Sequence, residues 1–340
     1  MPQPDLGDLY TSKELIDMER KVARLYEQAS KDIQEKLDDF TRKMAAKEKV
    51  LLQKVKDGKM TQEEFDHWKA GVAFRGKLWE QKAAQISAVL ADTNTVATNL
   101  LRDKQIGVFA MNSNYAAYNF EHGAGLSFGF DIYDEKTVAR LLADDPNILP
   151  FKKLDKKKDI KWNFKNIRSQ ITQGIVQGES IPKIAQRLAD VVPNRNKKQM
   201  VLHARTAMTS AQNGGRQERY KEAEKLGIKF KKIWRATLDG RTRDAHRDLD
   251  GQKVDPDKDF EVWGYKIRFP GDPWARPELV YNCRCTMITE DVEYPPDAQS
   301  RRAYREWTDD NGVKRKESYI IKDMTYREWE KWKQAGGEAR

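Results

Sequence analysis

Apolar side chains recur at steps of three and four along the first part of the chain, which is the spacing of a helix with one buried face. The first such pattern runs from Leu15 to Val55 without an internal proline, and Asp57-Gly58 closes it. Thr11 and Glu14 form a capping box, T-S-K-E, near its start. The pattern therefore predicts one helix of about 45 residues.

A second pattern of the same spacing runs from Phe65 to Leu90, after another box, T-Q-E-E, that opens at Thr61. Two long helices joined by a few residues predict an antiparallel helical hairpin, whose narrow apolar stripe needs a further helix or a partner to cover it. An intramolecular coiled coil and an assembly arm both fit that stripe, because the pattern names no partner. A shorter helix is expected from Ile106 to His122.

Further helix signals follow in the middle of the chain. Asp134 is expected to cap a short helix, Gly178 to stop another, and Ser180 with Pro182 to open the next. A separate helix is expected to open near Asn194. The glycine-rich segment 123–129 has no strand before it and no Lys-Ser/Thr after it, so it predicts a joint or a binding loop and not a phosphate loop.

After Gly227 the spacing of apolar residues changes from the three or four of a helix to the alternation of a strand. Residues 228–235 alternate like a strand, and short strand candidates follow at 251–254, 262–269 and 281–288. The tail predicts a hairpin around Asn311-Gly312 and a last helix capped by Thr325 with Glu328. The predicted fold class is α+β: a long N-terminal helical hairpin, then mixed helices, then a small C-terminal α+β module with short antiparallel strands. The expected segments are 1–104 (helical hairpin), 105–160 (short helices, glycine-rich joint and basic linker), 161–290 (the module and the helices before it) and 291–340 (hairpin and amphipathic helix).

The net charge of +10 is confined to part of the chain. Of the 63 basic and 53 acidic residues, 18 of each lie in residues 1–103, so the whole excess follows residue 103. A neutral arm suits packing against protein, and a basic remainder suits nucleic acid or another polyanion, although plain solubility accounts for a modest excess equally well. No apolar run approaches the ~20 residues of a membrane span, and we see no signal-peptide pattern.

The most basic stretch is 151–168, with eight basic and two acidic residues and with Trp162 and Phe164 among them. Aromatic rings can stack on bases while lysines contact phosphates. A solvated segment entering a helix, with both aromatic rings buried, is the alternative. The residues expected to contact DNA are Lys152, Lys153, Lys156, Lys157, Lys158, Lys161, Trp162, Lys229, Lys231, Lys232 and Arg235. No groove-reading motif is present, so such binding would not depend on sequence.

Chemically distinctive residues are concentrated between Arg235 and Met287. Asp239, Asp244 and His246 could form a hydrogen-bonded knot in which carboxylates fix the imidazole tautomer, either to pin irregular loops or to serve a metal-dependent hydrolase or nuclease. Cys283 and Cys285 on a strand would share one face, ~6.6–7 Å apart, where a direct disulfide is strained. They fit buried core thiols, and with His246 they also supply three zinc-type ligands, the fourth being water, an Asp or His203.

The ordered set A-R-T, D-G-R-T, His246, P-G-D and N-C-R-C resembles the minor head proteins of tailed bacteriophages, that is, the phage Mu F-protein-like head morphogenesis domain. The match covers roughly residues 165–290. The residues that carry this family motif, expected to be structural, are Arg205, Thr206, Asp239, Gly240, Arg241, Thr242, His246, Gly271, Asp272, Asn282, Cys283 and Cys285.

The resemblance implies a non-enzymatic phage minor capsid protein without a cofactor, present in a few copies per virion. Its implied partners are the portal protein, capsid or scaffold proteins, and double-stranded DNA bound nonspecifically. Its implied location is the virion, in the head interior or at the portal vertex, and the host cytoplasm during assembly. The family is also related to domains fused to toxins in some prophages. We expect no toxin payload here, because no long further domain follows the module.

Overall fold

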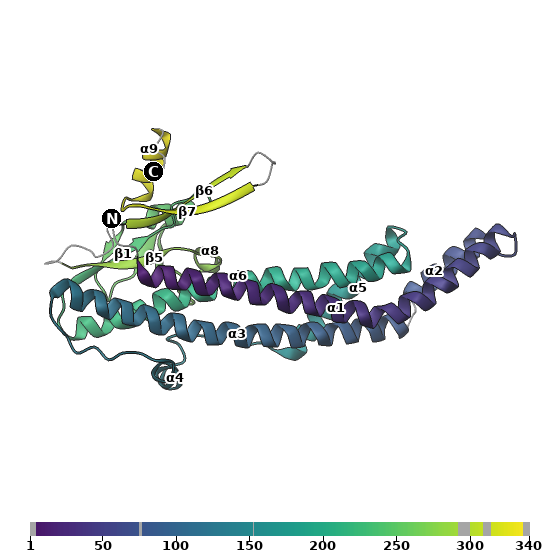
Figure 1. Cartoon of the computed structure of the whole chain (residues 1–340), viewed down its shortest axis with the longest axis horizontal. Coiled ribbons are helices and arrows are strands. Elements are labelled where there is room, and N and C mark those ends of the chain that lie inside the picture. Colours follow the sequence, from purple (N-terminus) through teal and green to yellow (C-terminus); the bar gives the residue numbers. More distant parts are fainter. Residues whose placement is uncertain (1–4, 75–76, 152, 292–299, 309–313, 336–340) are drawn as a thin grey trace. The chain divides into compact units, whose positions relative to one another are not determined.

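The computed structural model describes residues 5–74, 77–151, 153–291, 300–308 and 314–335 (Figure 1). As predicted, the chain is mostly helical, its long N-terminal helices pack together, and its small antiparallel sheets lie near the C-terminal region. The described helices are α1 (Leu6–Lys56), α2 (Gln62–Phe74), α3 (Lys77–Ala124), α4 (Glu135–Asp144), α5 (Lys156–Val176), α6 (Ile181–Lys225), α7 (Asp244–Leu249), α8 (Pro277–Val280) and α9 (Tyr326–Gln334). The described strands are β1 (Phe230–Arg235), β2 (Lys253–Val254), β3 (Phe260–Val262), β4 (Tyr265–Ile267), β5 (Thr286–Asp291), β6 (Ser300–Thr308) and β7 (Lys314–Lys322).

The chain folds into two compact units that are interleaved along the sequence. Unit 1 consists of Met1–Met18, Leu101–Phe151 and Leu202–Arg340, and unit 2 consists of Glu19–Leu100 and Lys152–Val201. Helices α1, α3 and α6 each contribute residues to both units. Among the described residues, no helix is long and apolar enough to cross a membrane.

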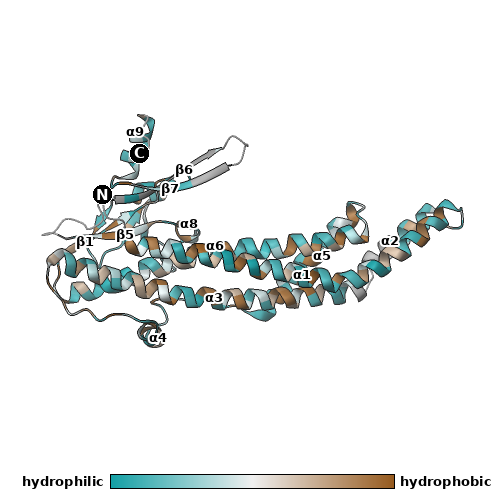
Figure 2. Ribbon diagram, viewed as in Figure 1, coloured by the Kyte–Doolittle hydropathy of each residue, from teal (hydrophilic) through white to brown (hydrophobic). Residues whose placement is uncertain are grey.

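Unit 2 is a bundle built from parts of α1, α3 and α6, together with the whole of α2 and α5. Lys82 of α3 donates to the carbonyl of Lys36, and Tyr26 of α1 donates to Asn94 of α3, so these two helices run antiparallel as the sequence predicted. Hydrophobic and hydrophilic positions alternate along each long helix (Figure 2). The apolar positions meet in one core that includes Ile33, Leu37, Ile86, Leu90, Ile167, Ile171, Ile184 and Leu188.

A buried polar layer crosses this apolar core and fixes the register of its helices. Asn94 donates to Asp159 of α5 at 2.8 Å and to Asn196 of α6 at 3.0 Å. Asn196 in turn donates to Asn163 of α5 at 3.0 Å. Polar side chains buried among apolar ones are tolerated because they satisfy one another, and a shifted helix would leave them unpaired. The layer thus sets which face of α5 points inward.

Three predicted helix boundaries were wrong. Helix α1 begins at Leu6, so Thr11 lies inside it, where its hydroxyl donates to the Gly7 carbonyl and accepts from Asn112. The residues expected to form a separate helix from 106 to 122 belong to α3. Helix α6 also passes through Pro193 without a break near Asn194.

The continuity of α6 at Pro193 has a specific cause. Proline has no N–H, so the carbonyl four residues earlier, on Ala189, loses its usual helical donor. The hydroxyl of Ser30 on α1 donates to that carbonyl at 2.7 Å. A neighbouring helix of unit 2 therefore replaces the missing hydrogen bond, which a reading of the local sequence could not reveal.

Other local predictions are confirmed. The box at Thr61 is formed with Glu64, Asp134 caps α4 by accepting from Thr137, and Thr325 forms a complete capping box with Glu328 at the start of α9. The segment that ends α5 contains Gly178 in the left-handed region, with φ of +69°. The tip of the predicted tail hairpin, Asn311-Gly312, lies outside the described residues, while its strands β6 and β7 pair antiparallel over nine positions.

Unit 1 contains the C-terminal module. Strand β1 lies between β2 and β5 in an antiparallel sheet, and β3 with β4 and β6 with β7 form two hairpins. Trp234 of β1 is fully buried against Phe260 and His246, with ring centroids 5.3 and 5.7 Å away. Trp329 of α9 packs with Leu238 and Ala303 in a smaller cluster. The last helix therefore docks on the module, and the Tyr326 hydroxyl also donates to the Asp239 carbonyl.

Candidate functional site

One buried carboxylate holds the turn between β1 and α7. Oδ1 of Asp239 accepts the backbone N–H of Arg241 at 3.0 Å and Nη2 of Arg284 at 2.9 Å, and Oδ2 pairs with Nη1 of Arg284. The Thr242 hydroxyl donates to the Thr237 carbonyl at 2.5 Å. The D-G-R-T turn is therefore tied by charge-assisted hydrogen bonds to the N-C-R-C segment, 45 residues later in the chain.

His246 of α7 and the two cysteines converge on one buried point. Nε2 of the ring lies 2.9 Å from the Leu279 carbonyl, which can only accept, so the neutral ring carries its proton on Nε2 and leaves Nδ1 unprotonated. Nδ1 lies 3.3 Å from Sγ of Cys285 and 3.7 Å from Sγ of Cys283. We name His246, Cys283 and Cys285 the thiol–imidazole cluster. Their three ligand atoms lie within 4.8 Å of one another.

This arrangement differs from the carboxylate knot expected from the sequence. Asp239 is paired with Arg284, and Asp244 is exposed and pairs with Arg247 at 3.2 Å. The Leu279 carbonyl, and no carboxylate, fixes the His246 tautomer. The two aspartates are close to His246 in sequence. In the fold, however, the ring contacts residues that are 33 to 39 positions away in the chain. The cysteines precede β5 and do not lie on a strand as expected.

The two thiols differ in acidity. Burial, together with the neighbouring Cys285, raises the pKa of the Cys283 thiol well above its ordinary value. Burial would also raise the pKa of Cys285, but its hydrogen bond with Cys283 and the nearby His246 ring hold that pKa well below the ordinary value. In the metal-free protein, Cys285 is therefore the thiol that loses its proton first.

The P-G-D motif closes a tight turn against α6. Gly271 has φ of +81°, and a Cβ added there would lie 2.8 Å from the backbone nitrogen of Ser210, so only glycine fits. Asp272, also buried, accepts from Nε and Nη2 of Arg268 at 2.9 and 2.5 Å. These contacts explain the motif as a structural element of the module.

Helix α6 supplies the other side of the module through its A-R-T segment. The hydroxyl of Thr206 accepts the backbone N–H of Asn282 at 2.9 Å, and Asn282 has φ of +56°, which turns the chain just before Cys283. Arg205 is half-buried on the same helix. Gly240 is exposed at the tip of its turn. The residues of the family motif are thus gathered from four separate stretches into one module, with structural contacts at most of them.

A second buried centre of unit 1, around Arg216, was missed from the sequence. Arg216 of α6 is 2% exposed, and its guanidinium bonds both carboxylate oxygens of Asp5, at 2.7 and 2.8 Å. It also donates to Oδ1 of Asn112 and to the Met287 carbonyl. The signal was its position in the small and polar face A-Q-N-G-G-R of α6, where Gly215 brings the helix against the backbone of Phe109.

The basic stretch forms an exposed stripe on α5. Asn163, Ile167 and Ile171 are buried and face the core of unit 2, so the positions spaced between them face solvent. Lys158, Lys161, Lys165 and Arg168 recur at steps of three and four on that outer side, and we name these four residues the basic stripe. Within the described part of the chain, no carboxylate oxygen lies within 4.0 Å of the charged groups of the last three.

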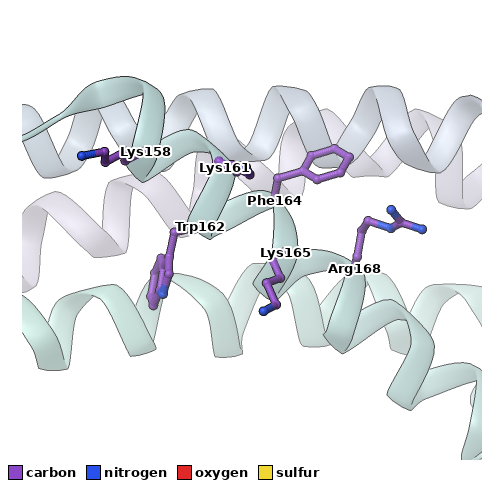
Figure 3. A pocket seen from close by; sticks show the side chains of 6 residues that line it. All are labelled: Lys158, Lys161, Trp162, Phe164, Lys165 and Arg168. Atoms are coloured by element: carbon purple, nitrogen blue, oxygen red, sulfur yellow. The ribbon is translucent and has the colours of Figure 1, made fainter.

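Two aromatic rings flank the basic stripe, one on each side, as Figure 3 shows. Trp162 and Phe164, both half-buried, line with its four cations an open depression of about 590 Å³. Trp162 also receives the guanidinium of Arg195, from α6, over its ring at 5.4 Å. The surface offers flat apolar faces flanked by positive charge, which is the combination used to hold the backbone and bases of a nucleic acid.

Some of the other residues expected to contact DNA are buried, and the others are exposed. Lys232 and Arg235 are 1% and 5% exposed, so they are removed from any phosphate-binding surface. The Lys232 ammonium donates to Gln217 and to the Arg268 carbonyl, and Arg235 pairs with Asp323. The exposed candidates are Lys153, Lys156, Lys157, Lys158, Lys161, Lys229 and Lys231, of which Lys156 pairs with Asp92 and Lys231 with Asp255. Lys152 lies outside the described residues.

The sequence of this chain is similar to those of known phage proteins. Residues 165–288 match the family described as Phage Mu protein F like protein. Over 339 residues, the chain is 26% identical to minor head protein GP7 of Bacillus phage SPP1, and the match covers 98% of this chain and all of that protein. Residues 165–288 are therefore a Mu F-like domain, and the chain as a whole is similar to a phage minor head protein.

Two further relatives share parts of the chain. The NAD(+)–arginine ADP-ribosyltransferase EFV of Enterococcus faecalis is 38% identical over 123 residues, which are 36% of this chain and 25% of that protein. The uncharacterized protein YqbB of Bacillus subtilis is 27% identical over 206 residues, which are 54% of this chain and 66% of that protein. No solved structure matches the chain.

Proposed function

We propose that this protein is a minor head protein of a tailed bacteriophage, a non-enzymatic component of the virion head. In this proposal it associates with the portal protein during head assembly and contacts packaged double-stranded DNA. The observation that carries it is the end-to-end similarity to minor head protein GP7, which extends over the long helices as well as the module. A relative that shared the module alone would support a common domain but not a common role.

The chemistry of the module supports a structural role over a hydrolase. A metal-dependent hydrolase needs a metal with an open position and a catalytic base that substrate can reach. His246 is 3% exposed, with both ring nitrogens occupied by neighbours, and Asp239 is engaged by Arg284. The similarity to the ADP-ribosyltransferase covers a quarter of that protein and does not bring its activity to this chain.

The basic stripe is the surface we propose for DNA. Its cations lie on one outer face of a helix, so they can follow a phosphate backbone without moving the buried residues of α5. Neutralising Z phosphates releases counterions, and log K then falls with log salt at a slope of about −0.9Z. Four contacts therefore predict a slope near −3.6, or roughly a 150-fold loss of affinity between 50 and 200 mM salt.

The DNA contact is tested by fluorescence anisotropy with two duplexes of unrelated sequence. We expect equal affinities for both, and the variant with Lys158, Lys161, Lys165 and Arg168 all changed to Gln should bind at least about tenfold more weakly, with a slope smaller by about 3–4. The matched control changes four exposed lysines of α1 to Gln and alters the net charge equally. These are Lys31, Lys49, Lys54 and Lys56. Equal losses in both variants, or no detectable binding at low salt, would refute this surface.

The portal association is tested by co-expression with the portal protein of the same phage, followed by size-exclusion chromatography. We expect a stable complex, and we expect the variant with a neutralised basic stripe to form it as well, because that stripe is assigned to DNA. If the chain elutes alone, with no portal protein bound, the central part of the proposal fails even where DNA binding is retained.

A further inference from the structure

The thiol–imidazole cluster has the dimensions of a metal site. A tetrahedral zinc ion with Zn–S bonds of about 2.3 Å and Zn–N bonds of about 2.05 Å holds its ligands about 3.6 Å apart for an S···N pair and about 3.8 Å apart for an S···S pair. The two S···N distances here are 3.3 and 3.7 Å, and all three ligand atoms lie within 4.8 Å of one another. The three ligand atoms therefore lie near three corners of the tetrahedron that a zinc ion would require.

We propose that His246, Cys283 and Cys285 bind one zinc ion, which links α7 to the segment before β5. The protein supplies three ligands, and a water molecule takes the fourth position. Among the described residues, no fourth His, Cys, Asp or Glu joins the group, so neither His203 nor an aspartate completes it. The burial of all three ligands keeps substrates away, so the ion serves the fold of the module and not a reaction.

Charge balance favours the ion at this depth. Cys283 and Cys285 are 2% and 3% exposed, and a lone buried charge is costly. Two thiolates, one neutral imidazole and one Zn²⁺ sum to zero, so the complete site buries no net charge. Without a metal, Nδ1 of His246 faces two sulfur atoms, which are at best weak hydrogen-bond donors.

The atoms around the cluster hold its ligands in place. The Leu279 carbonyl accepts from Nε2 of His246 and directs the Nδ1 lone pair at the sulfur atoms, as outer partners of zinc-bound histidines commonly do. The backbone N–H of Cys285 donates to Sγ of Cys283 at 3.4 Å, an arrangement that stabilises a thiolate. The geometry is therefore fixed before any ion binds.

The peptide that carries the two cysteines is anchored at every carbonyl. Thr209 donates to the Cys283 carbonyl at 2.7 Å, Thr237 to that of Arg284 at 2.6 Å, and Asn213 to that of Cys285 at 3.2 Å. Three consecutive carbonyls bound by three different side chains leave the peptide little freedom to rotate. A rigid C-x-C peptide facing a fixed imidazole presents three preplaced ligands to a zinc ion.

The same ligands could instead form a disulfide or remain free thiols, and each leaves a distinct signature. The ion closes a loop of 37 residues between His246 and Cys283, so its removal should loosen the module. The full-length chain, expressed in zinc-supplemented medium and purified without chelator, should contain about one zinc per chain by mass spectrometry of the metal. Removing the zinc should lower the Tm by roughly 5–10 °C.

Cys285→Ser and His246→Gln should lose most of the zinc, whereas His122→Gln, an exposed histidine on α3, should retain it. Because the first two variants can also misfold, the wild-type chain loaded with Co²⁺ gives a second readout. It should show thiolate-to-cobalt charge transfer and the intense visible bands of tetrahedral cobalt. Less than about 0.1 zinc per chain without those bands, or a Cys283–Cys285 disulfide found by alkylation and intact mass, would overturn the proposal.

Discussion

Replacing Asp5 by asparagine keeps the shape of the side chain and removes its charge. In the wild-type protein both oxygens of Asp5 bond to the buried guanidinium of Arg216. After the change, Asn112 and the Met287 carbonyl remain as neutral acceptors, and the charge of Arg216 stays buried without a counter-charge. Breaking a buried pair in this way costs about 3–5 kcal/mol, which corresponds to roughly 6–20 °C in the Tm of a unit of this size.

Differential scanning calorimetry of the full-length chain at pH 7 measures this shift. Asp8→Asn is the matched control, since Asp8 lies in the same helical turn and accepts from Gln212 at 3.3 Å. We expect the control to change the Tm by less than about 2 °C. If Asp5→Asn behaves like the control, the buried pair does not carry the stability assigned to it.

The same pair predicts a dependence on pH. Burial alone would raise the pKa of Asp5, but the charge and hydrogen bonds of Arg216 outweigh it and hold that pKa below its ordinary value of 3.8. The unfolded chain therefore takes up a proton at a higher pH than the folded one. The stabilisation is complete above about pH 4 and is lost as the pH falls through the folded pKa. Asp5→Asn should lack this acid-sensitive part of the stability.

Two further predictions concern stability alone. Burial lowers the pKa of Lys232 to about 8, against an ordinary 10.5, so the unfolded state binds more protons in that window and the free energy of unfolding should rise between pH 8 and 10. In urea melts, Lys232→Met should remove this rise, and an unchanged rise would contradict the assignment. Gly215→Ala should destabilise by more than about 3 kcal/mol, because its Cβ would lie 2.3 Å from the Phe109 carbonyl oxygen. Gly71→Ala on α2, with open space around its Cβ, should instead stabilise slightly, and equal effects would contradict the close approach.

The features predicted correctly from the sequence are those encoded locally. The capping boxes at Thr61 and Thr325 depend on residues three apart. The short antiparallel strands after Gly227 follow from an alternating, turn-separated pattern. Such signals need no knowledge of distant partners.

The features missed depend on residues far apart. Ser30 supplies the hydrogen bond that lets α6 continue through Pro193, across 159 positions. The His246 ring faces cysteines 37 and 39 residues away, although aspartates stand within seven. Lys232 and Arg235 were predicted to contact DNA, yet β1 is the central strand of its sheet and both side chains are buried. No local pattern encodes these choices.

The ion pair between Asp5 and Arg216 also limits how early unit 1 can be completed while the chain is being synthesised. The two residues are 211 positions apart, and the Met287 carbonyl that completes the site lies 71 positions further on. At about 5–20 residues per second, a ribosome needs roughly 10–40 s to reach Arg216 after it has made Asp5. During that interval the start of α1 lacks its partner. We therefore expect the start of α1 to pack into unit 1 only late in synthesis.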